Sequence, residues 1–419
     1  MLKYACPVKQ RKENIMRTGK YHIRYKVAEL IWMAAILLYS GIVFLRNTLL
    51  SSIVAISDPQ LHRLAVLGVI LLLIAEILEF RLDRTYLLKS IVIGILLGFL
   101  FLILFRWAET STMQKYYAQV FCYIFVARNF KWKHTGLAIG IEFLSLLLVL
   151  FILTNVGRLP NFVFVQSGGA RVRQALGFFY CLQFTACLLN TILLILSSRG
   201  RNIHIISLVI LMAASLLVYE MTDARIGFAG IGIAIIGALI YKLFPGIIEK
   251  IKWLFWVLSL SPCLYLIISV IAAKLYNPEI AWMSAANSKL EHRLEMSHGG
   301  LSNYGVSLFG QVVNWQGSGT NSSGYTALDT STYNWVDNVY VKELIDHGIV
   351  FEILLIVILT ATLIQCMRVE QYLDVFLISL LYGVGMLDDN LRIYCYNSMV
   401  LMIGVMLMQQ SKSVKTDGI

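Results

Sequence analysis

Charged side chains are scarce in this chain. Asp, Glu, Lys and Arg make up 14% of its 419 residues, whereas a soluble domain usually carries about 25%. Proline is also rare, with 6 residues, so the composition excludes a collagen-like or proline-rich disordered chain. Hydrophobic residues reach 58% instead, and the mean hydropathy is +0.73. These values predict one integral membrane domain with no separate soluble domain.

Several common motifs are also missing. The seven cysteines form no C-x-x-C pair and none lies in the longest polar stretch, so we expect neither a disulfide framework nor a structural zinc site. His292 and His298, with Glu291 and Glu295 nearby, have no recognised metal-ligand spacing. The chain has no glycine-rich phosphate loop and no basic-aromatic nucleic-acid module. We therefore expect no metal, no other cofactor and no nucleic acid.

Long apolar runs dominate what is present. Because about 20 apolar residues are needed to cross ~30 Å of hydrocarbon, these runs predict about twelve transmembrane helices. The expected fold class is all-α, a polytopic transmembrane helical bundle with one large extracytoplasmic loop before the tenth helix. The expected helices are Glu29–Phe44, Leu64–Phe80, Tyr86–Phe105, Tyr116–Val126, Leu137–Leu153, Leu176–Leu196, Ile203–Tyr219, Ile226–Leu243, Trp253–Ala273, Tyr340–Met367, Val375–Leu387 and Ile393–Met408.

The basic residues set the expected orientation. We divide the chain into a basic N-terminal tail (1–28), helices one to nine (29–273), the large loop (274–339), helices ten to twelve (340–408) and a C-terminal tail (409–419). Lys and Arg concentrate in the N-terminal tail and in alternate loops, which places both termini in the cytoplasm and the large loop outside. The net charge of +11 is then explained by topology and by contact with anionic membrane lipid.

Three basic sites converge on the predicted outer face. Arg171 and Arg173 precede the sixth helix, Arg225 lies in the short link between the seventh and eighth, and Arg293 lies in the large loop. An arginine at the membrane edge is costly unless it is paired or functional, and its planar guanidinium binds two phosphate oxygens at once. These sites suit a pyrophosphate-linked lipid. Alternatively, Arg225 pairs with a neighbouring carboxylate such as Asp223, and Arg171 and Arg173 anchor lipid headgroups.

The end of the large loop carries a further group of candidates. Asp337 could act as general base for a sugar hydroxyl, or else Asp337 or Asn338 could cap the following helix. Trp335 could stack on a sugar face or belong to the interfacial aromatic belt. Asp388, at the outer end of the eleventh helix, could contact substrate or simply be a solvated helix end.

Four short motifs carry a resemblance to a known family. They are Arg173–Phe178 (RQALGF), Thr222–Gly227 (TDARIG), Leu308–Gly310 (LFG), and Asp337–Tyr340 (DNVY) followed by Gly348–Ile349. In their order and spacing the chain resembles the Wzy-type O-antigen and capsule repeat-unit polymerases, within the O-antigen ligase-like superfamily. The resemblance covers about half of the chain. It departs from the family at Ala224, where Ser is frequent.

The resemblance implies a metal-independent glycosyltransferase in the bacterial cytoplasmic membrane. Such an enzyme polymerises undecaprenyl-pyrophosphate-linked oligosaccharide repeat units on the outer face, for capsule, exopolysaccharide or O-antigen. Arg173 and Arg225 would hold the pyrophosphate, and Asp337 would be the third catalytic residue. A chain-length regulator and a flippase are candidate partners. The expected substrate-binding residues are Arg171, Arg293, Trp335, Asn338, Tyr340 and Asp388.

Three alternatives stay open at this point. An O-antigen ligase-like glycosyltransferase would use the same donor, although related ligases often have His where this chain has Asp337. A polysaccharide flippase or other transporter would keep its polar residues at the midplane and have short loops. A polyprenyl-phosphate-sugar transferase would carry acidic pairs in the first outer loop, where this chain offers only Asp58.

The charge pattern yields a test of topology. A single cysteine at Asn303, in a background without the native cysteines, is expected to react with a membrane-impermeant thiol reagent in intact cells. A cysteine at Lys250 is expected to react only after the cells are opened, because its loop belongs to the basic, cytoplasmic set. Labelling at Lys250 but not at Asn303 in intact cells would reverse the orientation.

Overall fold

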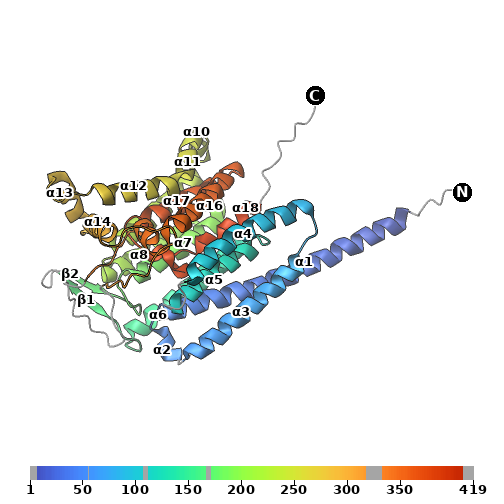
Figure 1. Ribbon diagram of the computed structural model, residues 1–419. Helices are drawn as coiled ribbons and strands as arrows, with labels where there is room; N and C mark the ends of the chain where they lie inside the picture. Colours follow the sequence, from blue (N-terminus) through green and yellow to red (C-terminus); the bar gives the residue numbers. More distant parts are fainter. Residues whose placement is uncertain (1–6, 55, 107–111, 167–170, 318–332, 409–419) are drawn as a thin grey trace.

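The structure is a computed structural model that describes residues 7–54, 56–106, 112–166, 171–317 and 333–408, without the side chains of residues 7–22, 112–116, 166 and 171. It consists almost entirely of helices (Figure 1). The α-helices are α1 (Pro7–Arg46), α2 (Leu50–Val54), α3 (Asp58–Glu79), α4 (Arg84–Arg106), α5 (Thr112–Ala127), α6 (Trp132–Asn155), α7 (Gln183–Arg199), α8 (Ile205–Thr222), α9 (Arg225–Leu243), α10 (Pro245–Lys250), α11 (Lys252–Ser259), α12 (Ser261–Leu275), α13 (Ala281–Lys289), α14 (Arg293–Tyr304), α15 (Val339–Asp346), α16 (Gly348–Arg368), α17 (Tyr372–Val384) and α18 (Met402–Met408).

The expectation of an all-α polytopic membrane protein is confirmed. Among the described residues, seven helices are long and apolar enough to cross a membrane, and the bent pair α11–α12 raises the number to eight. Large apolar side chains point outward on several of them, such as Ile77 (69% exposed), Ile95 (67%) and Ile206 (74%). Water would not tolerate so continuous an apolar surface, whereas hydrocarbon favours it. The seven spans are Ile23–Arg46, α3, α4, α6, α8, α9 and α16.

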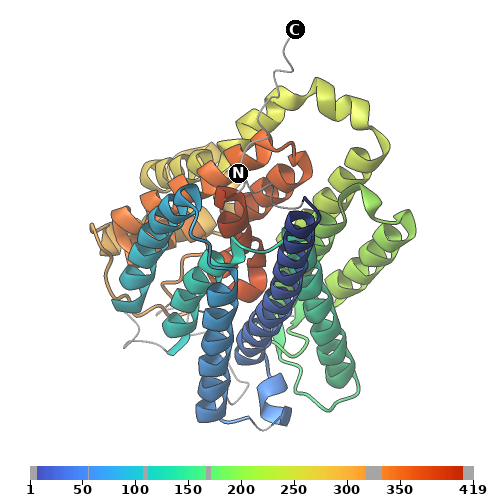
Figure 2. The same cartoon turned by 90° about the vertical axis from the view of Figure 1, so that its right-hand side faces the viewer.

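The helix bundle has two unlike ends. One end, which we call the loop end, carries the hairpin of β1 (Val163–Gln166) and β2 (Arg171–Gln174), the α8–α9 link, and helices α13 and α14. The opposite end, which we call the basic end, carries the first residues of α1 and the links α5–α6, α7–α8 and α16–α17. In Figure 1 the hairpin and α13 lie at the left and the start of α1 at the right. Figure 2 looks onto the basic end, where α10 and α11 arch over the rim.

Two of the expected helices are broken, one at a proline and one at a glycine. The ninth bends by 55° between α11 and α12, where Pro262 in the first turn of α12 has no N–H to continue the ladder. The tenth divides into α15 and α16 at Gly348, which has a φ of +90°. A Cβ on Gly348 would lie 2.3 Å from the backbone nitrogen of Gly310, so both the φ and the space require glycine there.

Other expected boundaries shift more strongly. The sixth helix was expected from Leu176 but begins at Gln183, because residues 176–182 form a buried loop instead. The first half of the expected twelfth helix is 3₁₀, with η4 (Tyr394–Tyr396) and η5 (Ser398–Leu401) before α18, and with η3 (Asn390–Arg392) preceding them. The short β1–β2 hairpin was not predicted.

Asn190 on α7 explains how an irregular segment is held inside the bundle. Its side chain donates to the backbone carbonyl of Cys395 (3.0 Å) and accepts from the backbone N–H of Ser398 (3.0 Å). Asn190 itself is fully buried. Non-helical backbone is tolerated at membrane depth only where protein satisfies its polar groups. The hydrogen bonds from Asn190 on α7 therefore allow the segment from Asn390 to Leu401 to stay non-helical inside the bundle, where it lines a cavity.

Candidate functional site

A cavity of about 380 Å³ opens beside α15 at the loop end. Its walls come from α15, the first turns of α16, the 3₁₀ segment η3–η5, α5 and the end of the large loop. One part of its lining is polar and aromatic, and the other is apolar, from membrane-spanning helices and α5. The polar and aromatic lining includes Trp315, Trp335, Tyr340, Lys342, Glu343, Asp346, His347, Asp389, Asn390 and Arg392. The apolar lining includes Leu104, Val120, Phe121, Phe351, Leu355, Ile356 and Leu359.

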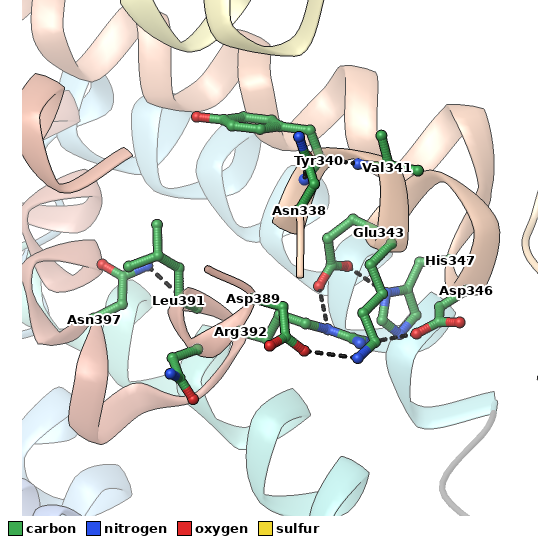
Figure 3. Close-up of polar contacts among 12 residues, drawn as sticks. Asn338, Tyr340, Val341, Glu343, Asp346, His347, Asp389, Leu391, Arg392 and Asn397 are labelled. Carbon is green, nitrogen blue, oxygen red and sulfur yellow. Dashed lines mark hydrogen bonds and ion pairs between the residues drawn. The ribbon is translucent and has the colours of Figure 1, made fainter. Parts of the chain in front are cut away.

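Buried ion pairs hold the polar wall together (Figure 3). Arg392 donates from Nε to Glu343 (2.7 Å) and from a terminal nitrogen to Asp346 (2.7 Å). These pairs fasten η3 to two successive turns of α15. A buried charge is strongly unfavourable without such a partner, so Arg392 and its two carboxylates stabilise one another only as a set.

Lys342 connects the ion pairs to the aromatic lining. Its ammonium lies 2.6 Å from a carboxylate oxygen of Asp389 and 3.1 Å from the centre of the Trp335 ring. The Lys342 side chain is 1% exposed. A cation over an indole face adds an attraction that holds the ring in one orientation. Trp335 therefore lines the cavity in one fixed orientation, with Lys342 over its ring.

His347 is a chemically useful group that the sequence did not single out. Its Nδ1 contacts Glu343, whereas its Nε2 has no hydrogen-bond partner in the described part of the chain. Burial raises the pKa of Glu343, but His347 and Arg392 lower it to about 2, so the carboxylate is ionised. Nδ1 is thus occupied by the ionised carboxylate, and Nε2 is the ring nitrogen of a cavity-lining side chain that has no partner among the described residues.

The predicted arginines form a second cluster beside the cavity. Arg173, 3% exposed, donates from Nε to the backbone carbonyl of Thr222 (3.2 Å). Arg225 is 63% exposed at its side chain and lies 3.3 Å from Asp223, which is the pairing that the structural alternative predicted. The pair does not occupy the whole guanidinium, so Arg225 still offers donors to solvent. Residues Asn390 and Leu391 separate this cluster from the cavity, since both line the cavity and also border the α8–α9 link.

Asp337 is held by Arg293, which approaches it at 3.3 Å. Burial and the charge of Asp389 raise the pKa of Asp337 to about 6, against the opposing effects of Arg293 and Lys342. Burial also raises the pKa of Tyr180, on which the charges of Asp337 and Arg173 act in opposite directions. The charge of Asp337 therefore interacts with groups of the cavity wall.

Asp388 extends the same acidic region. Burial and the neighbouring Asp389 raise the pKa of Asp388 to about 7, and the charge of Asp337 acts in the same direction. Its Oδ1 accepts from the backbone N–H of Asn390 (2.9 Å). Asp388 is therefore a partly buried turn residue, which does not match the solvated helix end that we considered.

Several motif residues serve the fold. Asn338, and not Asp337, caps α15, because its side chain accepts from the N–H groups of Tyr340 and Val341. Tyr340 donates its hydroxyl to the carbonyl of Tyr382 (2.9 Å). Gly227 packs against Thr185, where a Cβ would meet the side chain at 2.7 Å. These positions fix the helices around the site and need no direct role in binding.

The predicted residues thus divide by place. Trp335 and Tyr340 line the cavity, whereas Asp337, Arg293 and Asp388 lie beside it. Arg173 and Arg225 lie in the adjacent cluster, and the side chain of Arg171 falls outside the described part of the chain. The residues that the sequence did not single out are Lys342, Glu343, Asp346, His347 and Arg392. The sequence feature that could have pointed to this wall is the run Lys342–His347. Four of its six side chains are ionisable, although the expected helix is otherwise apolar.

Comparison with known proteins adds no relative. The chain matches no protein-family model, no curated protein and no solved structure. Within the described residues, no three His, Cys, Asp or Glu side chains are grouped so that they could hold a metal ion.

The buried ion pairs predict a large difference between two arginines. Arg392→Met leaves Glu343 and Asp346 without their shared cation, and we expect it to lower the free energy of unfolding by about 3–5 kcal/mol. Arg225→Met is the matched control, and we expect a change within about 0.5 kcal/mol because that side chain is largely exposed. Unfolding of the purified proteins in detergent measures both. Equal stability of the two variants would show that the Arg392 pairs contribute nothing.

Proposed function

We propose that this protein polymerises undecaprenyl-pyrophosphate-linked oligosaccharide repeat units on the outer face of the bacterial cytoplasmic membrane. The observation that carries the proposal is that an aromatic, hydrogen-bonding cavity adjoins the arginine-bearing α8–α9 link, since Asn390 and Leu391 border both. A polymerase must hold two lipid-linked substrates at once, one by its pyrophosphate and one by its acceptor sugar. Two unlike neighbouring subsites, with the Arg293–Asp337 pair in the same region, suit that requirement.

The proposed topology has twelve crossings with both termini in the cytoplasm. The eight candidate spans are joined in this proposal by α7 and by three shorter apolar helices, Tyr117–Ala127, Tyr372–Val384 and Ser398–Met408. The loop end then faces outward and the basic end faces the cytoplasm, in agreement with the concentration of Lys and Arg near cytoplasmic helix ends. Residues 274–339 form the outer loop that ends at the site.

The arginine cluster is the proposed donor subsite. Arg225 offers guanidinium donors to solvent, and Arg173 is held by Thr222 at the same α8–α9 link. Two guanidinium groups, one from β2 and one from the start of α9, can each take a pair of pyrophosphate oxygens at this link. They bind the negative charge that grows on the pyrophosphate as the glycosidic carbon leaves it, which stabilises the transition state. Arg293 supports this arrangement through its contact with Asp337.

The cavity is the proposed acceptor subsite. Trp315 and Trp335 supply faces for a sugar ring, and Asp389 and Asn390 supply polar atoms for hydroxyl groups. The carboxylates of the lining outnumber its cations, so the cavity suits an uncharged sugar better than a pyrophosphate. The apolar lining from α4, α5 and α16 leads away from the sugar toward the hydrocarbon, as an attached polyprenyl chain requires.

The proposed reaction moves one proton and one bond. An acceptor hydroxyl oxygen attacks the anomeric carbon of the donor glycan, and its proton passes to the base. The bond from that carbon to the pyrophosphate oxygen breaks, and its electron pair leaves with undecaprenyl pyrophosphate. Asp337 is the predicted base, and at neutral pH a carboxyl with a pKa of about 6 is mostly ionised and ready to accept. The imidazole of His347 is the second group in the site able to take the proton.

Two other functions make different demands on the same site. An O-antigen ligase-like transferase would use the arginine cluster in the same way but would accept a sugar that is not linked to undecaprenyl pyrophosphate. A polysaccharide flippase or transporter would move the lipid-linked glycan and form no glycosidic bond. Purified protein given a single lipid-linked repeat unit distinguishes all three, because only a polymerase makes longer lipid-linked glycans from it.

The donor subsite leads to a test of charge geometry. Arg225→Ala is expected to abolish polymer while leaving the protein folded, and Arg225→Lys to restore little, because an ammonium cannot bind two oxygens in a plane. Arg173→Ala is expected to abolish polymer as well, with a folding assay beside it since Arg173 is buried. Arg158→Ala, exposed at the same end, is the matched control and should keep polymer. Normal polymer in both Arg173→Ala and Arg225→Ala would refute the pyrophosphate role.

The proton acceptor is tested by comparing two isosteric changes. Because Asn338 caps α15, Asp337→Asn costs no cap, and we expect normal protein level with a rate about 10²–10⁴ lower. His347→Gln keeps a polar side chain in the cavity wall but removes the basic nitrogen. Release of undecaprenyl pyrophosphate from purified variants measures both. A full rate in Asp337→Asn together with a large loss in His347→Gln would transfer the role of base to His347.

A further inference from the structure

A second cavity, of about 560 Å³, lies at the basic end, on the far side of the bundle from the proposed site. The start of α6, the end of α7 and the α16–α17 link form its walls, with Tyr241 from α9 and two residues of α18. The proposed reaction uses none of its residues. Its volume is within the range of about 300–1,000 Å³ that small-molecule sites occupy.

Three exposed cations of this lining have no partner among the residues that the structure describes. Lys131, Lys133 and Arg199 form no ion pair or hydrogen bond through their side chains within the described part of the chain. Arg128 in the same wall is different, because Glu76 pairs with it and its guanidinium lies 3.6 Å from the centre of the Phe125 ring. Arg128 therefore has a structural role, whereas the other three cations are available to a ligand.

Two helix N-termini beside the same cavity also favour the binding of an anion. Two helices, α6 of 24 residues and α17 of 13 residues, begin beside it, and Trp132 of α6 and Leu373 of α17 are among its lining residues. The first N–H groups of a helix have no acceptor within the helix and carry partial positive charge. Ser198, 4% exposed, adds a buried hydroxyl without a hydrogen-bond partner among the described residues.

The acidic groups of the lining do not neutralise this set. Asp374 accepts a hydrogen bond from Ser197, which in turn accepts from the indole of Trp132. That chain of bonds ties α17 to α7 and α6 and makes the wall rigid. Glu370 is exposed beside the cavity. The three unpartnered cations therefore outnumber the two carboxylates, one of which is already hydrogen-bonded.

From these observations we infer that the cavity at the basic end binds the phosphate group of an anionic phospholipid. The unpartnered cations lie at the ends of membrane-spanning helices, which is the level of lipid headgroups. Basic groups between helix ends at that level attract anionic headgroups more strongly than neutral ones. The inference does not depend on the proposed polymerase activity, and it gives these cations a specific ligand besides their effect on topology.

The test uses the full chain in a neutral detergent. Short-chain phosphatidylglycerol and short-chain phosphatidylcholine are titrated separately, and the shift of the thermal unfolding midpoint gives each dissociation constant. We expect the wild type to bind phosphatidylglycerol at least about tenfold more tightly than phosphatidylcholine. The triple variant Lys131→Gln, Lys133→Gln, Arg199→Gln is expected to lose at least about tenfold in affinity for phosphatidylglycerol, which is about 1.4 kcal/mol.

A matched variant separates the cavity from general surface charge. Arg84→Gln, Lys89→Gln, Lys250→Gln removes three cations from the same end but none from the cavity, and it should bind as the wild type does. Equal losses in the two triple variants would assign binding to surface charge and overturn the site. Inorganic phosphate is the third arm. A midpoint shift by phosphate alone that matches phosphatidylglycerol, and that the cavity variant abolishes, would assign the cavity to soluble phosphate compounds and overturn the lipid assignment.

Discussion

Burial of Arg392 between Glu343 and Asp346 is the constraint on which the loop end depends. The two carboxylates come from α15 and the guanidinium from η3, so the pairs join segments that are more than forty residues apart in the chain. Each charge would be expensive alone in this setting, which makes the arrangement nearly all-or-none. With α15 fastened in this way, Lys342 reaches Asp389 and Trp335, and His347 is fixed by Glu343. The ion pairs thus define both the shape of the cavity and the chemistry of its wall.

Close backbone contacts between the large loop and the start of α16 also make the loop end rigid. Gly310 and Gly348 both have positive φ angles and lie too close together for any Cβ. The carbonyls of Ser307 and Leu308 accept from the N–H groups of Ile349 and Val350, at 3.0 and 3.1 Å. The loop segment before the site is therefore attached to the first turn of α16. This explains in physical terms why short glycine motifs far apart in the chain belong to one structural unit.

The two cavities use positive charge differently. At the loop end, Lys342 and Arg392 are paired with carboxylates, and only Arg225 in the neighbouring cluster is largely exposed. At the basic end, Lys131, Lys133 and Arg199 have no described partner. Paired cations shape a site and hold side chains in place, whereas unpaired cations attract ligands. On this basis the paired set fits the proposed sugar subsite, and Arg225 and the basic-end cations fit the proposed phosphate ligands.

The sequence by itself determined the class of protein. Apolar runs of membrane length predicted an all-α polytopic protein. An unpaired backbone polar group is strongly unfavourable in hydrocarbon, and a helix pairs these groups within one segment. It also pointed to the Arg173, Arg225 and Asp337 region, since an arginine near a membrane edge is conspicuous. It did not predict the bend at Pro262, the break at Gly348 or the 3₁₀ segment from Asn390 to Leu401.

Only the tertiary structure decided which polar residues meet. Lys342, Glu343, Asp346 and His347 looked like a polar turn in an expected membrane helix, and their partners Asp389 and Arg392 lie beyond the next helix. Asn190 gives no local signal either, because its role depends on carbonyl and N–H groups more than two hundred residues away. Apolar periodicity is a local property that a sequence displays directly. Ion pairs and buried hydrogen bonds depend on how distant segments pack, and that packing is fixed only when the whole bundle forms.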